Sequence, residues 1–206
     1  MKLIAIAVAA LAATASAYTD ADRDAAYKFV EDAGFPLLEG FKHMTPKMLR
    51  TVLEAYGRVT SPDSFEYLDA TDLEILYTAV SAANNCEMCL SFHALALKEK
   101  LSEGDLKLML AGGVPQDDER AYALAVAAKY ALAHKGILLD REKKHLATLG
   151  FDSEEKILEV VYAAGFMAAN NAAYIHMIGN GMELEGFLQQ AGPFAGTVYP
   201  VIKEEL

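Results

Sequence analysis

The chain has the composition of a helical protein and lacks the pattern of a β-sheet. It is rich in Ala, Leu, Glu and Lys, and no sustained run of alternating β-branched residues occurs in it. Residues 61–63, 112–115 and 150–152 carry the Gly, Pro, Ser and Asp typical of loops, and Ser102 and Ser153 precede acidic residues as N-caps do. We expect helices over residues 20–31, 47–58, 71–84, 87–101, 104–110, 119–134, 141–148, 154–170 and 172–179. The sequence therefore predicts an all-α bundle.

The first 17 residues have the features of a secretory signal peptide. Lys2 supplies a short positive start, residues 3–13 are apolar, and Ala15-Ser16-Ala17 is a small-x-small cleavage site. The apolar run is too short to span a membrane, and no later stretch reaches the roughly 18 uncharged apolar residues that a membrane helix needs. No linker divides the rest, so we expect residues 18–206 to form a single soluble domain.

The last four residues, 203–206, read KEEL. This tail resembles the KDEL-type address that is read by a retention receptor of the endoplasmic reticulum. Together with the leader it favours the secretory pathway and the lumen of the endoplasmic reticulum. A plastid, or a bacterial periplasm, is the alternative destination for such a leader.

The chain is acidic, with a formal net charge of −11, and loss of Lys2 with the leader would make it about −12. Such a surface repels nucleic acid and anionic membranes. We therefore expect neither a nucleic acid nor a membrane as a partner.

A short internal repeat is present. Residues 82–85 read AANN, and the same four letters recur at 168–171, in each case at the expected end of one apolar helix and before another. If the repeat is structural, two related helical hairpins share one core, and only the first carries thiols.

Both cysteines of the chain lie just after the first copy of the repeat, in NNCEMCLSFH at residues 84–93. With Asn84 or Asn85 as the N-cap of the next helix, Cys86 takes its first position and Cys89 lies in its first turn. The spacing of Cys86, Cys89 and His93 is i, i+3, i+7, which places them on one helix face within about 60° of each other. The positive end of a helix favours a thiolate, and His93 can pass protons along the same face.

One carboxylate on the preceding helix belongs with these residues. Glu74 lies off the apolar stripe of that helix, on a line with Thr78, Ser81 and Asn85 that leads toward the thiols. A partly desolvated carboxylate beside a dithiol is suited to act as a general base.

The set Glu74, Cys86-x-x-Cys89 and His93 resembles the motif of the AhpD-like alkyl hydroperoxidases, a group within the carboxymuconolactone decarboxylase superfamily. The resemblance extends loosely over residues 68–187 and implies an all-helical domain of the AhpD-like type. It also implies that Cys89 attacks a hydroperoxide, that Cys86 resolves the product to a disulfide, and that Glu74 and His93 relay protons. A small dithiol or a thioredoxin-like protein would be the reductant, and the protein would form a homo-oligomer, a trimer or a hexamer.

The chain departs from the family's motif at one position. The best-known form has a second histidine just before the second cysteine, and here that residue is Met88. Because Met cannot carry a proton, the relay is shortened. Either Glu87 or water substitutes for the missing histidine, or the activity is lower or different.

Other interpretations of the two cysteines compete with this one. A structural Cys86–Cys89 disulfide would close a loop of four residues and stabilise by only roughly 2 kcal/mol. A zinc site would need a second ligand pair, and no second CxxC or HxxxH occurs, so we expect neither a metal nor a cofactor. Two further functions stay open: an acid–base enzyme of the decarboxylase type, which needs no cysteine, and a non-catalytic helical binding module.

Overall fold

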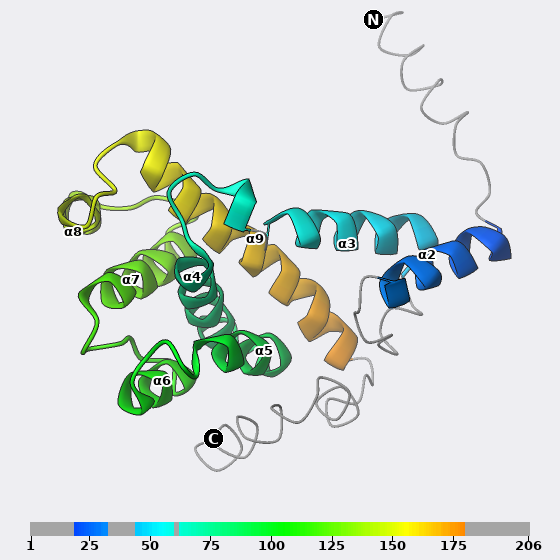
Figure 1. Ribbon diagram of the computed structural model, residues 1–206, viewed down its shortest axis with the longest axis horizontal. Coiled ribbons are helices and arrows are strands. Elements are labelled where there is room, and N and C mark those ends of the chain that lie inside the picture. Colours follow the sequence, from blue (N-terminus) through cyan, green and yellow to red (C-terminus); the bar gives the residue numbers. More distant parts are fainter. Residues whose placement is uncertain (1–18, 33–43, 60–61, 180–206) are drawn as a thin grey trace, which may run out of the picture.

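The computed structural model describes residues 19–32, 44–59 and 62–179 of the chain (Figure 1). The regular elements within these ranges are all helical, which confirms the all-α prediction. They are α2 (Asp20–Asp32), α3 (Pro46–Val59), the 3₁₀ helix η2 (Pro62–Ser64), α4 (Ala70–Ala83), α5 (Glu87–Leu97), α6 (Glu103–Leu110), α7 (Glu119–Ala133), α8 (Asp140–Thr148) and α9 (Glu154–Gly179). The expected signal peptide and the KEEL tail lie outside the described residues.

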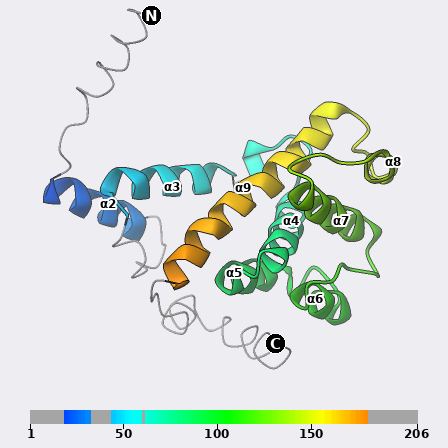
Figure 2. The same cartoon turned by 180° about the vertical axis from the view of Figure 1, so that it is seen from behind.

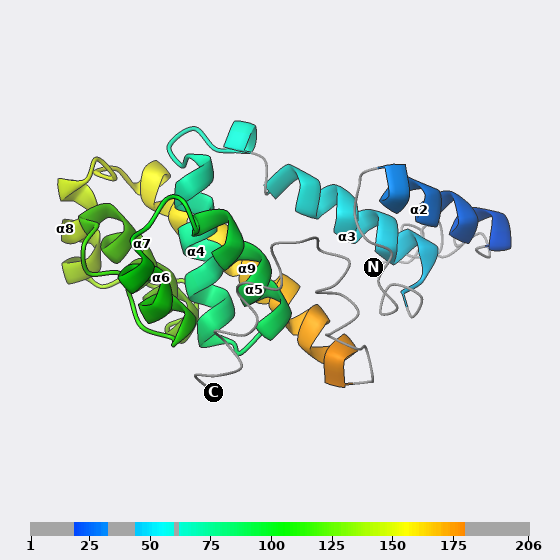
Figure 3. The ribbon, with the colours of Figure 1, turned by 60° about the horizontal axis from the view of Figure 1, so that its bottom comes forward.

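Helix α4 is the centre of the bundle. It packs against α5, α7 and α9, and α7 in turn packs against α8 and α9. Figures 1 and 2, which view the molecule from opposite sides, show the long α9 crossing α4 obliquely. Helices α2 and α3 pack on each other and extend to one side of the bundle, as Figure 3 shows most clearly.

The core of the bundle is formed mainly by apolar residues of α4, α7 and α9. Helix α4 is buried over most of its length, and α7 contributes a series of buried alanines whose small side chains allow close approach of the helices. A partly buried ion pair joins these two helices, with Arg120 Nη2 2.6 Å from Asp72 Oδ2. The same Asp72 closes a capping box with Asp69 at the start of α4. These contacts fix the start of α4 against α7.

Most predicted helix limits agree with the observed ones to within one residue; the exceptions are the end of α5 and the predicted break within α9. Helix α5 ends at Leu97 rather than at residue 101, because the chain tightens into turns in which Lys100 N and Leu101 N both donate to Leu97 O. Ser102 is the N-cap of α6, as predicted, and accepts a hydrogen bond from Asp105 N.

The prediction of two helices over 154–170 and 172–179 is wrong, because α9 is continuous from Glu154 to Gly179. The second AANN copy therefore lies inside a helix, whereas the first lies at the end of α4. Asparagine is a modest helix former, but Asn170 and Asn171 are both buried here. The packing of their side chains outweighs the local preference of Asn for turns.

No helix in the described ranges combines the length and the apolar character that crossing a membrane requires.

Candidate redox site

The turn between α4 and α5 differs from the prediction that Asn84 or Asn85 caps α5. Asn84 is the C-cap of α4, Asn85 adopts a left-handed conformation with φ of 54°, and Cys86 itself is the N-cap of α5. Cys86 N donates to Ser81 O at 3.0 Å and Asn85 N donates to Ala82 O at 3.2 Å, which is the Schellman pattern of helix termination. Asparagine tolerates the left-handed conformation better than most residues. The end of α4 therefore delivers Cys86 directly to the start of α5.

Cys86 and Cys89 form a disulfide bond, with their Cα atoms 5.4 Å apart. This separation lies within the ordinary range for a disulfide. The two residues occupy the N-cap and the third helical position of α5, where backbone N–H groups of the first turn lack helical partners. Their relative exposures are 0% and 4%, so both residues are buried.

His93 and Glu74 form a hydrogen-bonded pair beside this disulfide helix. His93 Nδ1 lies 2.8 Å from Glu74 Oε2, and the exposed fractions of the two side chains are 3% and 25%. An ionised carboxylate only accepts hydrogen bonds, so Nδ1 of the ring carries the hydrogen. In the neutral ring, Nε2 is then free of hydrogen and can accept a proton. The imidazole is buried, but its partner reaches solvent.

Two aromatic rings hold the imidazole of His93 in place. Tyr77 and Phe92 meet it edge-on, with ring centroids 5.1 Å and 5.4 Å away. Tyr77 also donates a hydrogen bond from its hydroxyl to Val59 O at 2.7 Å, which links α4 to the end of α3. Burial, followed by the nearby charge of Glu74, raises the pKa of Tyr77 well above its ordinary value. Tyr77 therefore remains neutral and serves as a fixed wall of the site.

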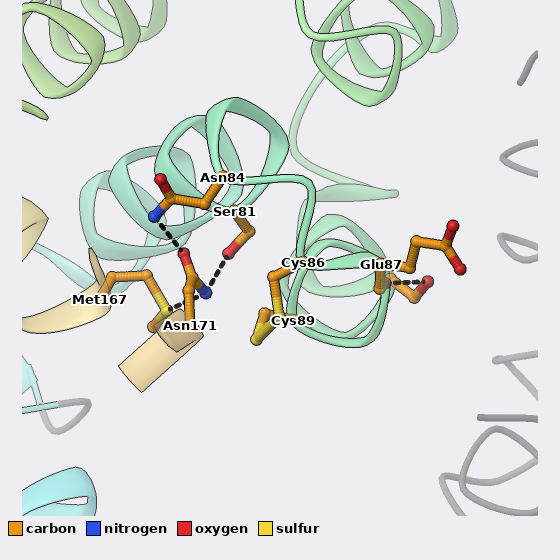
Figure 4. The surroundings of a disulfide bond; sticks show 8 residues. Ser81, Asn84, Cys86, Glu87, Cys89, Met167 and Asn171 are labelled. Carbon is orange, nitrogen blue, oxygen red and sulfur yellow. Dashed lines mark hydrogen bonds between the residues drawn. A yellow bond between two sulfur atoms is a disulfide. The ribbon is translucent and has the colours of Figure 1, made fainter. Parts of the chain in front are cut away.

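The sequence prediction missed a polar network next to the disulfide, shown in Figure 4. Asn84 Nδ2 donates to Asn171 Oδ1 at 3.1 Å, and Asn171 Nδ2 donates to Ser81 Oγ at 3.1 Å and contacts Met167 Sδ at 3.4 Å. The available signal was the AANN repeat, because its two copies supply the two asparagines that meet.

Two further residues of the predicted site region are buried. Met88, which stands where the family's motif has a histidine, is 3% exposed. The hydroxyl of Thr78 is buried on α4 and has no hydrogen-bond partner among the described residues. The region between α4 and α5 thus combines apolar walls with a few isolated polar groups.

The arrangement can support sulfur and proton chemistry. A disulfide can be reduced to two thiols, and the unpaired N–H groups at the start of α5 favour a thiolate there. The His93–Glu74 pair can accept and release a proton. In the described ranges, no three acidic, cysteine or histidine side chains gather as a metal site would require.

Comparison with known proteins shows a family similarity in this region. Residues 46–129 match the model of the Carboxymuconolactone decarboxylase family, which includes AhpD-like proteins. The match runs from the start of α3 into α7, so it contains Glu74, both cysteines and His93 but neither α8 nor α9. A search of curated proteins finds no match to the chain. Residues 46–129 of this protein, which include the disulfide and the His93–Glu74 pair, are thus similar to the Carboxymuconolactone decarboxylase family.

Proposed function

We propose that this protein is a thiol-dependent, peroxidase-like oxidoreductase that reduces hydroperoxides through the Cys86–Cys89 pair. The observation that carries the proposal is the placement of a disulfide at the start of α5 and, one turn further along the same helix, a histidine paired with a carboxylate. The disulfide is the oxidised form of the proposed cycle.

The cycle begins when a reductant opens the disulfide. A small dithiol or a thioredoxin-like protein supplies two electrons, the Cys86–Cys89 bond breaks, and the reductant leaves as a disulfide. Two protons from the dithiol balance the two thiols that form. This step regenerates the form that reacts with peroxide.

Cys89 then attacks the hydroperoxide. Its thiolate bonds to the terminal peroxide oxygen, the O–O bond breaks, and the leaving alkoxide takes up a proton to become an alcohol. Cys89 is left as a sulfenic acid. The thiolate of Cys86 attacks that sulfur, the S–O bond breaks, and protonation of the departing hydroxide gives water and the starting disulfide.

His93 and Glu74 move the protons of these steps. Cys89 and His93 are separated by one helical turn, so they share a face of α5. His93 Nε2 accepts the proton of the Cys89 thiol, and the imidazolium is stabilised by the carboxylate that its Nδ1–H already contacts. Because Glu74 is partly exposed, it connects the buried imidazole to solvent.

A hydroperoxide-consumption assay with a dithiol reductant tests this proposal. Turnover by the wild-type protein that disappears in both Cys86→Ser and Cys89→Ser supports it. Turnover of a lactone substrate that persists in both variants would instead identify an acid–base enzyme of the decarboxylase type. Absence of turnover with any hydroperoxide would contradict the peroxidase proposal and favour a binding module.

The resemblance to AhpD-like proteins also leads us to propose a homo-oligomer, a trimer or a hexamer. Sedimentation equilibrium on the full chain would test it, and a monomer at all concentrations would refute it.

A further inference from the structure

The buried network of Ser81, Asn84 and Asn171 links α9 to the turn that carries the disulfide. Asn171 and Ser81 are both 0% exposed, and they come from helices α9 and α4. Burying an amide among apolar residues is unfavourable unless its hydrogen bonds are made, and an apolar side chain would fill this place at lower cost. The network therefore calls for an explanation beyond packing.

The network is attached to both ends of the turn. Ser81 O accepts the hydrogen bond from Cys86 N, and Asn84 is the C-cap of α4. In Figure 4 the side chains of Asn171 and Met167 lie on the side of the turn toward which the sulfur atoms point, whereas the carboxylate of Glu87 points away. The network thus lies on the side of the turn where the sulfurs react.

The direction of the hydrogen bonds leaves one donor unused. The Nδ2 group of Asn171 has only hydrogens to offer, so Ser81 Oγ is the acceptor in their 3.1 Å hydrogen bond. The hydrogen of the Ser81 hydroxyl is not needed for that bond, and it reaches no acceptor among the described residues while the disulfide is closed. A disulfide sulfur is a weak acceptor, but a thiolate is a charged and much stronger one.

We propose that the Ser81 hydroxyl, oriented by Asn171, donates a hydrogen bond to the sulfur of Cys86 when the disulfide is reduced, and so stabilises its thiolate. Ser81 would touch the reacting sulfur, and Asn171 would be a positioning residue. The functional part of this inference rests on the proposed peroxidase cycle, in which the Cys86 thiolate attacks the sulfenic acid of Cys89. Ser81 would then promote the resolving step and leave the first oxidation unchanged.

The first experiment measures the Cys86 thiol without any peroxide. In a Cys89→Ser background Cys86 is the only thiol, because the chain has two cysteines. The rate of alkylation by iodoacetamide as a function of pH reports its pKa. Adding Ser81→Ala removes a hydrogen bond to a charged group, so the thiolate-to-thiol ratio should fall about tenfold. Ser81→Thr, which keeps the hydroxyl, should restore the ratio.

A matched control is available on the neighbouring helix. Ser91 is also buried, but its hydroxyl donates to Glu87 O within α5 at 2.7 Å. Ser91→Ala should leave the alkylation profile of Cys86 unchanged. Asn171→Ala removes the amide that orients the Ser81 hydroxyl. It should shift the alkylation profile of Cys86 in the same direction as Ser81→Ala but by less.

The second experiment uses the protein with both cysteines. Equilibration with a dithiol buffer should show that Ser81→Ala shifts the thiol–disulfide equilibrium toward the disulfide by about tenfold, or about 30 mV to more negative potential. Rapid mixing with one equivalent of hydroperoxide should show a slower loss of sulfenic acid with an unchanged rate of its formation. Circular dichroism of each variant checks that the helices are intact.

The outcomes separate the two proposals. Equal alkylation profiles for Ser81→Ala and Ser91→Ala would overturn the role of Ser81, even if the wild-type protein consumes peroxide. An unchanged profile in Asn171→Ala beside a shifted one in Ser81→Ala would overturn the positioning role. A wild-type protein that consumes no hydroperoxide would refute the peroxidase cycle, while the alkylation result would decide the hydrogen bond to Cys86 by itself.

Discussion

The replacement Glu74→Gln tests the proton relay most directly. It preserves the size of the side chain and its capacity to accept a hydrogen bond from His93 Nδ1, which lies 2.8 Å from Glu74 Oε2. What it removes is the negative charge that stabilises the imidazolium formed when His93 takes up a proton. The variant should therefore fold as the wild type does and react more slowly.

The size of the effect follows from the geometry. At 2.8 Å the attraction between an imidazolium and a carboxylate is roughly 6 kcal/mol at an effective dielectric constant of about 20. Since the Glu74 side chain is 25% exposed, solvent screens part of this attraction. If the variant loses about 3–5 kcal/mol of transition-state stabilisation, its rate falls by about 10²–10⁴-fold, which is the usual contribution of one positioned base.

The assay is single-turnover oxidation of Cys89 in the reduced protein, followed by quenching and mass spectrometry of the trapped thiol. Glu99→Gln is the control, because it removes one negative charge from an exposed residue in the turn after α5. Oxidation in Glu74→Gln within about threefold of the control would show that the carboxylate has no role in activating the thiol. A thermal midpoint equal to that of the wild type would confirm that the comparison concerns chemistry.

Three further predictions concern the thiols, the imidazole and the tyrosine. One equivalent of hydroperoxide should convert Cys89 to a sulfenic acid in the Cys86→Ser protein, which mass spectrometry after dimedone trapping would detect. Oxidation of Cys86 in the Cys89→Ser protein instead would show that the two thiols have the opposite roles. His93→Gln should slow thiol oxidation by about 10²–10⁴-fold. Combining it with Glu74→Gln should slow the reaction little further, because the two residues act as one relay. Single-turnover rates in which the two effects on the activation free energy add fully would contradict this. The pKa of Tyr77 is raised in the folded protein by burial and then by Glu74, so its contribution to stability is complete below the unfolded pKa of about 10 and is lost as pH rises above it. Tyr77→Phe should lower the free energy of unfolding by about 1 kcal/mol near neutral pH, because the hydrogen bond to Val59 O is lost. Above pH of about 10, thermal-unfolding scans should show that the stability of the variant declines less steeply with pH than that of the wild type. Equal declines in the two proteins would refute the raised pKa of Tyr77.

Much of the local structure was predictable from the sequence, because it depends on neighbours along the chain. The Asp69–Asp72 capping box and the Ser102 cap are interactions over three residues, and they start α4 and α6 within one residue of the predicted positions. The similarity to the Carboxymuconolactone decarboxylase family was also predictable, since the spacing of Glu74, Cys86, Cys89 and His93 is itself a sequence feature and the match to residues 46–129 includes all four. Which roles these residues perform remains a prediction.

The tertiary structure decided what distant segments do to each other. The continuity of α9 through Asn170 and Asn171 goes with the burial of both residues, which a local preference of Asn for turns does not reveal. The position of Cys86 as the N-cap of α5 is a different case, because it follows from a local Schellman turn over residues 81–86 that the sequence prediction did not identify. The hydrogen bonds of Asn171 to Asn84 and Ser81 join residues about 90 positions apart. Such residues meet only when their helices pack around the shared core. The free energy of burying apolar surface in that core offsets the conformational entropy lost on folding, and the local sequence does not specify these contacts.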